Sequence, residues 1–263
     1  MNKLEKKMVE ILVRLRTEHG ATAVKASLEA EGILPYELMR TKEITMAAGV
    51  GMTVKIGGCE AITDARMAKG FGVNALMSPM IESRFALEKF LGMASNVFDE
   101  EDREDTRMLI NIETLDGCDK MDQILSAENL ELLGGIVLGR TDLSNAMKVE
   151  DPDSKLLLDK AKEVFAKAKG KSIRCLVGGN ITAKTVPFLS ALSGLLDGFE
   201  TRKVVFANFC MDYCCRDRAE LEQAILLAVE FEYYWYLSRQ KIYQPLLNED
   251  AGRIKKLASI LGV

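Results

Sequence analysis

Residues 108–144 read MLINIETLDGCDKMDQILSAENLELLGGIVLGRTDLS, and this stretch contains the pattern that decides the fold. Two short runs of apolar and β-branched residues, 108–112 and 135–138, are separated by polar turn residues and a helical pattern. A strand, a helix and a strand in this order form a βαβ unit, in which the two strands run parallel and the helix covers one face. The stretch therefore predicts part of a parallel sheet with its helices outside.

The same alternation extends along most of the chain. Further strands are expected at residues 21–28, 52–56, 74–77, 173–177, 195–199 and 203–206. Eight strands in a chain of 263 residues suit a single closed barrel. The sequence therefore predicts an α/β fold, a TIM (β/α)8 barrel, in one domain over residues 1–263. The last two strands leave little room for a helix between them.

Both ends of the chain predict helices. Apolar residues at helical spacing from Leu4 to Leu15 indicate an amphipathic helix that ends at Gly20. Residues 216–243 predict a long helix whose middle is apolar around most of its circumference. Such a helix needs cover on more than one side. We expect the helical segment 216–263 to pack on its own barrel or on a partner subunit, and the protein to form a homo-oligomer.

The composition excludes several classes of protein. A hydrophobic content of 48%, a charged content of 28% and a net charge of −4 are typical of a soluble globular protein without the basic excess of a nucleic-acid binder. Apolar runs are interrupted by charges well before the roughly 20 residues of a membrane span, and the N-terminus lacks the apolar core of a secretion signal. The sequence therefore predicts a cytoplasmic protein that binds neither nucleic acid nor membrane.

Cysteine and histidine usage narrows the chemistry. Six cysteines in a chain of this length suit reduced thiols, although Cys210, Cys214 and Cys215 could form a soft-metal site. His19 is the one histidine, and it lies in a polar stretch before a glycine, which is typical of a helix end. A Ser-His triad or a multi-histidine metal site is therefore not expected.

Charged residues and glycines follow the predicted strands. Barrel enzymes carry their reacting groups at the carboxyl ends of the strands. The residues at these positions are Glu29, Lys55, Glu82, Glu113, Asp142, the run 178–180 and the run 200–203. A carboxylate on a loop is usually only solvated. Glu113 and Asp142, however, follow adjacent strands and have the oxygen chemistry that Mg²⁺ or Mn²⁺ requires, so they are candidate ligands of one ion.

At these residues the sequence resembles the HpcH/HpaI family of class II aldolases and citrate-lyase β-subunit-like enzymes, over about residues 24–206. Ile112-Glu113-Thr114 is similar to the family's metal-binding glutamate, and residues 139–144, GRTDLS, are similar to its metal motif. The resemblance implies a divalent metal, Mg²⁺, Mn²⁺ or Co²⁺, held by Glu113 and Asp142. It also implies that the backbone N–H groups of Thr141 and Asp142 bind the substrate carboxylate. The implied activity is carbon–carbon cleavage of a small 2-oxo acid through a metal-stabilised enolate.

Two departures from the family pattern affect the expected mechanism. Lys55 stands where the family usually has an arginine beside the substrate's carbonyl oxygen; a lysine supplies charge there without the planar two-pronged contact. The glutamate-histidine pair of bacterial pyruvate aldolases is absent, and the corresponding segment reads Leu28-Glu29-Ala30-Glu31. We therefore expect Lys55 to face the enolate oxygen and Glu29 or metal-bound water to serve as the base.

The segment 198–203 is expected to lie over the same opening. Arg202 is the candidate to bind a second anionic part of the substrate, because its guanidinium can hold a carboxylate bidentately. Lys203, one residue later on a possible strand, should project to the opposite side. In the alternative interpretation, Arg202 and Glu200 pair with each other or with neighbouring carboxylates and hold the rim together.

Two other functions remain open. The first is a citrate-lyase-like lyase of acyl-CoA thioesters, for which no adenine and pantetheine channel is identified in the sequence. The second is a non-catalytic barrel that binds a small acid. The retained metal carboxylates argue against that second function, whereas the missing arginine and histidine favour it.

Overall fold

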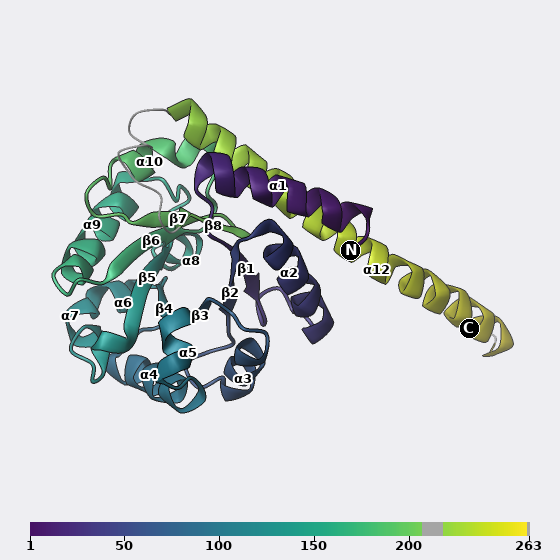
Figure 1. The fold of residues 1–263 in the computed structure, drawn as a ribbon, viewed down its shortest axis with the longest axis horizontal. Helices are drawn as coiled ribbons and strands as arrows, with labels where there is room; N and C mark the ends of the chain where they lie inside the picture. Colours follow the sequence, from purple (N-terminus) through teal and green to yellow (C-terminus); the bar gives the residue numbers. More distant parts are fainter. Residues whose placement is uncertain (207–217, 262–263) are drawn as a thin grey trace.

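Eight short strands close into a barrel in which each strand lies beside its neighbours in sequence (Figure 1). The computed structural model describes residues 1–206 and 218–261, so the predicted cysteine cluster at 210–215 lies outside the described residues. The strands are β1 (Ala23–Ser27), β2 (Gly51–Lys55), β3 (Ala75–Ser78), β4 (Arg107–Ile112), β5 (Leu133–Gly139), β6 (Arg174–Gly178), β7 (Gly198–Glu200) and β8 (Val204–Phe206). The predicted fold class is confirmed.

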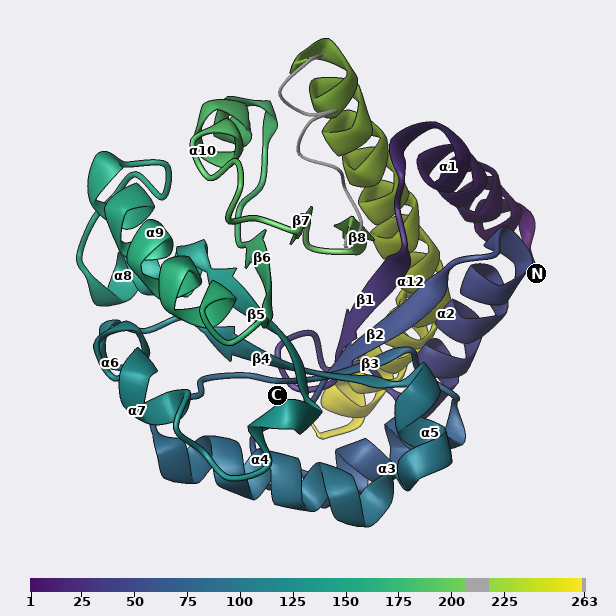
Figure 2. The same cartoon turned by 60° about the vertical axis from the view of Figure 1, so that its left-hand side comes forward.

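Helices lie around the outside of this barrel (Figure 2). They are α1 (Lys3–His19), α2 (Pro35–Ala48), α3 (Ile62–Gly70), α4 (Arg84–Val97), α5 (Glu100–Asp105), α6 (Leu115–Asp119), α7 (Met121–Ile124), α8 (Arg140–Ala146), α9 (Lys155–Lys169), α10 (Val186–Ser190) and α12 (Arg218–Leu261). Two 3-10 turns lie at Leu130–Leu132 and Ala183–Thr185. Among the residues that the structure describes, no helix is both long enough and apolar enough to span a membrane.

Successive side chains of each strand point to opposite faces of the sheet, and this produces two separate apolar clusters. The outer cluster fills the space between strands and helices and includes the fully buried Phe90 and Phe165. The inner cluster lies inside the barrel and consists of Ala23, Ala75, Met77, Leu109, Val137, Leu176 and Val205. Because successive strand residues point to opposite faces, Lys25 on β1 and Asn111 on β4 point inward like Ala23 and Leu109. The inner cluster is therefore continued toward the carboxyl ends by polar side chains.

The last strand runs in the opposite direction to the others. Seven strands are parallel, as predicted, but β8 pairs antiparallel with both β7 and β1. Only three residues separate Glu200 from Val204, whereas a parallel connection needs about a dozen. The two strands instead form a hairpin closed by a hydrogen bond from Thr201 N to Val204 O of 2.9 Å. The expectation of a fully parallel sheet was therefore wrong for this strand, and the turn of the hairpin lies at the carboxyl end of the barrel.

The two terminal helices pack against each other. Figure 1 shows α1 beside α12 and the end of α12 running past the barrel. The N-terminal half of α12 packs on the barrel, and its buried side chains, such as Phe231 and Trp235, belong to the outer cluster. The helix continues to Leu261, well beyond the predicted end at Tyr243, although Pro245 lies inside it. The C-terminal half of α12 leaves several apolar side chains exposed, namely Leu246, Leu247, Ile254, Leu257 and Ile260.

A buried ion pair joins the hairpin turn to the loop after β1. Lys203 is 1% exposed and its Nζ lies 2.6 Å from Glu31 Oε2 and 3.6 Å from the ring centroid of Trp235 on α12. Burial lowers the pKa of Lys203 to about 8, against the opposite effect of Glu31. Arg202 Nε also lies 3.4 Å from Glu31 Oε1. The expectation that Arg202 and Lys203 project to opposite sides was therefore wrong, because residues 201–203 form a turn and not a strand.

This ion pair generates a prediction about stability. Lys203→Met should lower the free energy of unfolding by about 3 kcal/mol, because it leaves the Glu31 carboxylate buried without its closest cation. The double variant Lys203→Met, Glu31→Gln should lose less than the single variant, since the uncompensated charge is removed with its partner. Urea unfolding of the three proteins measures both quantities.

A matched control comes from Lys155, whose side chain is 86% exposed and pairs with Asp159 on the same helix. Lys155→Met should change the free energy of unfolding by less than about 0.5 kcal/mol. An equally small effect of Lys203→Met would show that the buried pair does not stabilise the fold.

Candidate active site at the carboxyl ends of the strands

Three donors hold Glu113 at the carboxyl end of the barrel. Glu113 directly follows β4 and is 2% exposed. Lys55 Nζ at the end of β2 lies 3.2 Å and 3.4 Å from its two carboxylate oxygens, and Asn111 Nδ2 lies 2.8 Å from Oε2. The backbone N–H of Met80, a residue with φ of +52°, donates to Oε1 at 3.2 Å. A buried carboxylate needs such donors, and together they fix its orientation.

A glycine on the neighbouring strand makes room for this carboxylate. A Cβ atom built on Gly139 would lie 2.6 Å from Glu113 Oε2 and 2.8 Å from Glu113 Cβ. Real Cβ atoms do not approach other atoms so closely, so any other residue at the end of β5 would displace Glu113. The glycine of the GRTDLS run therefore makes room for the carboxylate that follows the neighbouring strand.

Asp142 lies beside Glu113 from the first turn of α8. The pKa of Asp142 is raised above its usual range by burial and then by the negative charge of Glu113, while Lys55 acts in the opposite direction. Two carboxylates in one partly buried place repel each other, and a cation between them removes this cost. In the part of the chain that the structure describes, no group of three or more His, Cys, Asp or Glu side chains could hold a metal. The pair Glu113 and Asp142 nevertheless fits Mg²⁺ or Mn²⁺, which commonly take one or two protein carboxylates and leave other positions to water and substrate.

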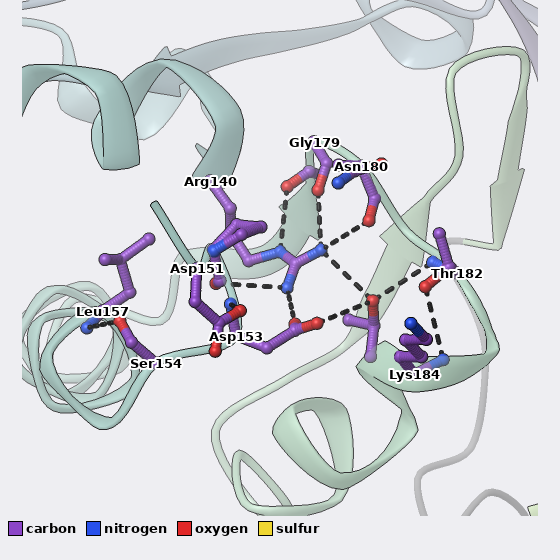
Figure 3. Close-up of polar contacts among 12 residues, drawn as sticks. Arg140, Asp151, Asp153, Ser154, Leu157, Gly179, Asn180, Thr182 and Lys184 are labelled. Atoms are coloured by element: carbon purple, nitrogen blue, oxygen red, sulfur yellow. Dashed lines mark hydrogen bonds and ion pairs between the residues drawn. The ribbon is translucent and has the colours of Figure 1, made fainter. Parts of the chain in front are cut away.

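Arg140 ties the loop after β5 to the loop after β6 (Figure 3). Its side chain is completely buried, and its guanidinium donates to the carbonyl oxygens of Gly179 at 2.6 Å and Asn180 at 3.1 Å. It also forms an ion pair with Asp153 and lies 4.9 Å from the ring centroid of Phe188. Because a guanidinium has five donors in a fixed plane, one side chain can satisfy all these acceptors.

The second glycine of the 178–180 run allows the same two loops to meet. Gly179 has a φ of +83°, which side chains other than glycine rarely adopt. A Cβ on Gly179 would also lie 2.6 Å from the backbone N of Thr141. The first turn of α8, with the N–H groups of Thr141 and Asp142, is therefore placed by direct backbone packing on the end of β6.

The remaining predicted residues lie at the rim of the mouth. Glu29 is exposed and its side chain lies over Gly57, where a Cβ atom would be 2.8 Å from Glu29 Cγ. Arg202 is 58% exposed and lies 3.4 Å from Glu31 and 3.9 Å from Glu232 of α12. This is the arrangement expected of a residue that holds the rim together.

Three residues at the site were not singled out from the sequence. Asn111 and Lys25 lie inside strands, where periodicity alone assigns residues to a face without saying which face encloses a site. A signal was present, because Asn111 lies two residues before Glu113 and therefore on the same face. Arg140 lies between two residues of the metal motif, and nothing in the sequence indicates that its side chain turns away from the mouth.

Arg140 generates a prediction about stability and metal binding together. Arg140→Lys should lower the free energy of unfolding by about 3 kcal/mol, because an ammonium cannot reach the carbonyls of both loops. It should also weaken Mn²⁺ binding, since Asp142 lies in the turn that Arg140 anchors. Thermal unfolding and calorimetric titration with Mn²⁺ measure the two effects. Arg84→Lys, on an exposed face of α4, is the control and should change neither. A stable Arg140→Lys protein with unchanged Mn²⁺ affinity would contradict this role.

Three solved structures contain the same kind of barrel. An HpcH/HpaI aldolase from Desulfitobacterium hafniense DCB-2 matches with a TM-score of 0.60 at 15% identity, over 72% of this chain and 80% of that chain. An HpcH/HpaI aldolase/citrate lyase family protein from Burkholderia cenocepacia J2315 matches with a TM-score of 0.59 at 13% identity, over 75% and 83%. The citrate synthase SbnG matches with a TM-score of 0.57 at 15% identity, over 89% of each chain. At these identities the likeness shows the fold alone.

The family follows from the sequence comparison. A search of curated proteins gave no match. The sequence pattern of the HpcH/HpaI aldolase/citrate lyase family, however, matches residues 36–181, a range that is more than half of the chain and contains Lys55, Glu113 and Asp142. The chain therefore belongs to the HpcH/HpaI aldolase/citrate lyase family.

Proposed function

We propose that this protein is a divalent-metal-dependent lyase that cleaves a carbon–carbon bond in a small 2-oxo acid. Membership of a family of aldolases and citrate lyases supports a lyase. The observation that carries the finer proposal is the pair of adjacent carboxylates, Glu113 and Asp142, with Lys55 beside them. A cluster of one buried acid, one exposed acid and a partly buried lysine suits a cation and an anionic substrate bound together.

Glu113 and Asp142 would hold the metal, with Mg²⁺ or Mn²⁺ as the expected ion and Co²⁺ as a third. When bound, a divalent cation supplies Lewis-acid polarisation of the substrate's carbonyl group. Asn111 and the Met80 N–H orient Glu113 for this purpose through their hydrogen bonds.

Lys55 would stabilise the negative charge that develops on the carbonyl oxygen during cleavage. Its Nζ contacts Glu113 and its side chain is 18% exposed, so it lies between the buried carboxylate and the open mouth. A fixed positive group beside a developing oxyanion lowers the barrier because it needs no reorganisation during the reaction. The N–H groups of Thr141 and Asp142 would receive the substrate carboxylate on the opposite side.

Two of the predicted site residues, Glu29 and Arg202, lie at the rim of the mouth. The sequence predicts Glu29 or metal-bound water as the base, and Glu29 is exposed and lies over the loop after β2. Arg202 remains a proposed contact for a second anionic group, which would have to compete with Glu31 and Glu232. A homo-oligomer also remains a proposal, supported by the exposed apolar side chains on the C-terminal half of α12.

The metal ligands generate a first prediction for this function. Glu113→Gln and Asp142→Asn should each weaken Mn²⁺ binding by more than the roughly 10- to 100-fold that loss of an outer partner costs. Calorimetric titration of metal-free protein measures this. Glu60→Gln is the control, because its side chain is 66% exposed and pairs with Lys89 on the surface. Wild-type affinity in both carboxylate variants would exclude a metal at this position.

Activity assays separate the three candidate functions. The wild-type protein, freed of metal, should cleave a hydroxylated 2-oxo acid only after Mg²⁺, Mn²⁺ or Co²⁺ is added. Metal-dependent turnover of an acyl-CoA thioester without turnover of 2-oxo acids would instead favour the citrate-lyase-like alternative. Metal binding with no turnover of either class would favour the non-catalytic barrel.

Lys55 generates a second prediction for this function. Lys55→Met should lower kcat by about 10²- to 10³-fold at saturating metal, as loss of one oxyanion donor does in other enzymes. Lys55→Arg should retain more activity, since it keeps the charge. Steady-state kinetics and a melting curve with Mn²⁺ present measure rate and folding separately. A kcat within twofold of wild type in Lys55→Met would reduce Lys55 to a structural partner of Glu113.

A further inference from the structure

A second buried carboxylate lies in the barrel mouth and has no part in the function proposed above. Glu200 ends β7 and is 2% exposed. Its Oε1 accepts a hydrogen bond from Lys25 Nζ on β1. Within residues 1–206 and 218–261, its other oxygen, Oε2, is buried and has no hydrogen-bond partner. Leaving a buried carboxylate oxygen unsatisfied is costly, so a purely structural ion pair does not account for this arrangement.

Two glycines in register place Glu200 next to the candidate metal ligand. Gly139 on β5 and Gly178 on β6 are paired across adjacent strands, which lie about 4.8 Å apart. A Cβ on Gly139 would touch Glu113 Oε2 at 2.6 Å, and a Cβ on Gly178 would lie 3.0 Å from Glu200 Oε1. The two carboxylates therefore reach over neighbouring glycines from the strands on either side, and both face the same opening.

Two lysines accompany the two carboxylates. Lys25 pairs with Glu200, and Lys55 pairs with Glu113. The lysine side chains are 15% and 18% exposed, whereas each carboxylate side chain is 2% exposed. The Lys25–Glu200 pair thus resembles the Lys55–Glu113 pair, but it is not needed to bind the proposed metal.

The site needs a proton acceptor, and the single histidine cannot supply one. His19 ends α1 and is 7% exposed, just before β1 begins, so it belongs to the amino end of the barrel. Among residues 1–206 and 218–261, Glu200 is a further buried carboxylate at the carboxyl ends of the strands once Glu113 and Asp142 are assigned to the metal. Its hydrogen bond with Lys25 fixes its position, and its second oxygen has no hydrogen-bond partner among the described residues.

We infer that Glu200 is the catalytic base that takes the hydroxyl proton of a 4-hydroxylated 2-oxo acid, and that Lys25 is its positioning residue. This inference rests on the proposed lyase function. In the cleavage direction, Glu200 Oε2 takes the proton of the 4-hydroxyl group while the C4–O bond becomes a carbonyl. The C3–C4 bond breaks, and its electron pair moves into the enolate of the shorter 2-oxo acid. In the reverse direction Glu200 returns the same proton to the new hydroxyl group.

Two reactions with one shared intermediate separate this role from a structural one. Cleavage of a 4-hydroxy-2-oxo acid requires removal of a hydroxyl proton, whereas decarboxylation of oxaloacetate gives the enolate without a proton acceptor. Glu200→Gln should lower kcat for cleavage by about 10²- to 10⁴-fold, the usual contribution of a positioned base. It should leave the rate of oxaloacetate decarboxylation within about twofold of wild type, and calorimetric Mn²⁺ affinity unchanged. Glu60→Gln should leave all three unchanged.

A second variant keeps the test decisive. In Glu200→Ala, added formate should restore part of the cleavage rate, because it supplies a carboxylate to the vacated space, and should not alter decarboxylation. Equal losses of both reactions in Glu200→Gln, or no rescue by formate in a folded Glu200→Ala protein, would overturn the inference. If Glu200→Gln does not fold, Glu200→Asp, which preserves the charge, gives the same comparison of the two reactions. A wild-type protein that decarboxylates oxaloacetate without any metal would instead refute the proposed function itself.

Discussion

The need to pair buried charges governs the carboxyl end of this barrel. A carboxylate or guanidinium without water is stable only with an opposite charge and enough hydrogen-bond partners. Glu113 meets this need through Lys55, Asn111 and a backbone N–H, and Arg140 meets it through Asp153 and the carbonyls of the next loop. The charged side chains therefore fix one another, and through them the loops that carry the proposed site.

Glycine positions determine how closely these charges can be assembled. Gly139 and Gly178 admit carboxylates from the strands beside them, and Gly179 admits the backbone of α8. A Cβ atom would collide with Glu113 at Gly139 and with the Thr141 backbone at Gly179, and it would lie tightly against Glu200 at Gly178. Space at the mouth is thus created by the strands themselves, and the loops only cover it.

Closure by an antiparallel hairpin distinguishes this chain from a regular (β/α)8 barrel. The turn between β7 and β8 lies at the mouth, which brings Lys203 and Arg202 to Glu31 and to α12. A helical crossover would have carried the chain back to the amino end before the eighth strand. The hairpin therefore couples the rim to the C-terminal helix and makes the last strand part of the site's wall.

The sequence alone determined the barrel, because strand and helix periods are local properties that repeat along the chain. It also indicated Glu113, Asp142 and Lys55 as neighbours, since the carboxyl ends of parallel strands meet at one end of a barrel. The sequence alone did not determine the direction of β8. Its short connection to β7 can be seen in the sequence, but only the pairing with β1 and β7 shows that the strand is antiparallel. The partner of Glu200 and the inward turn of Lys25 were likewise decided by tertiary structure. Their contact joins residues 175 positions apart, and no local pattern specifies which side chains meet across the interior of a closed barrel.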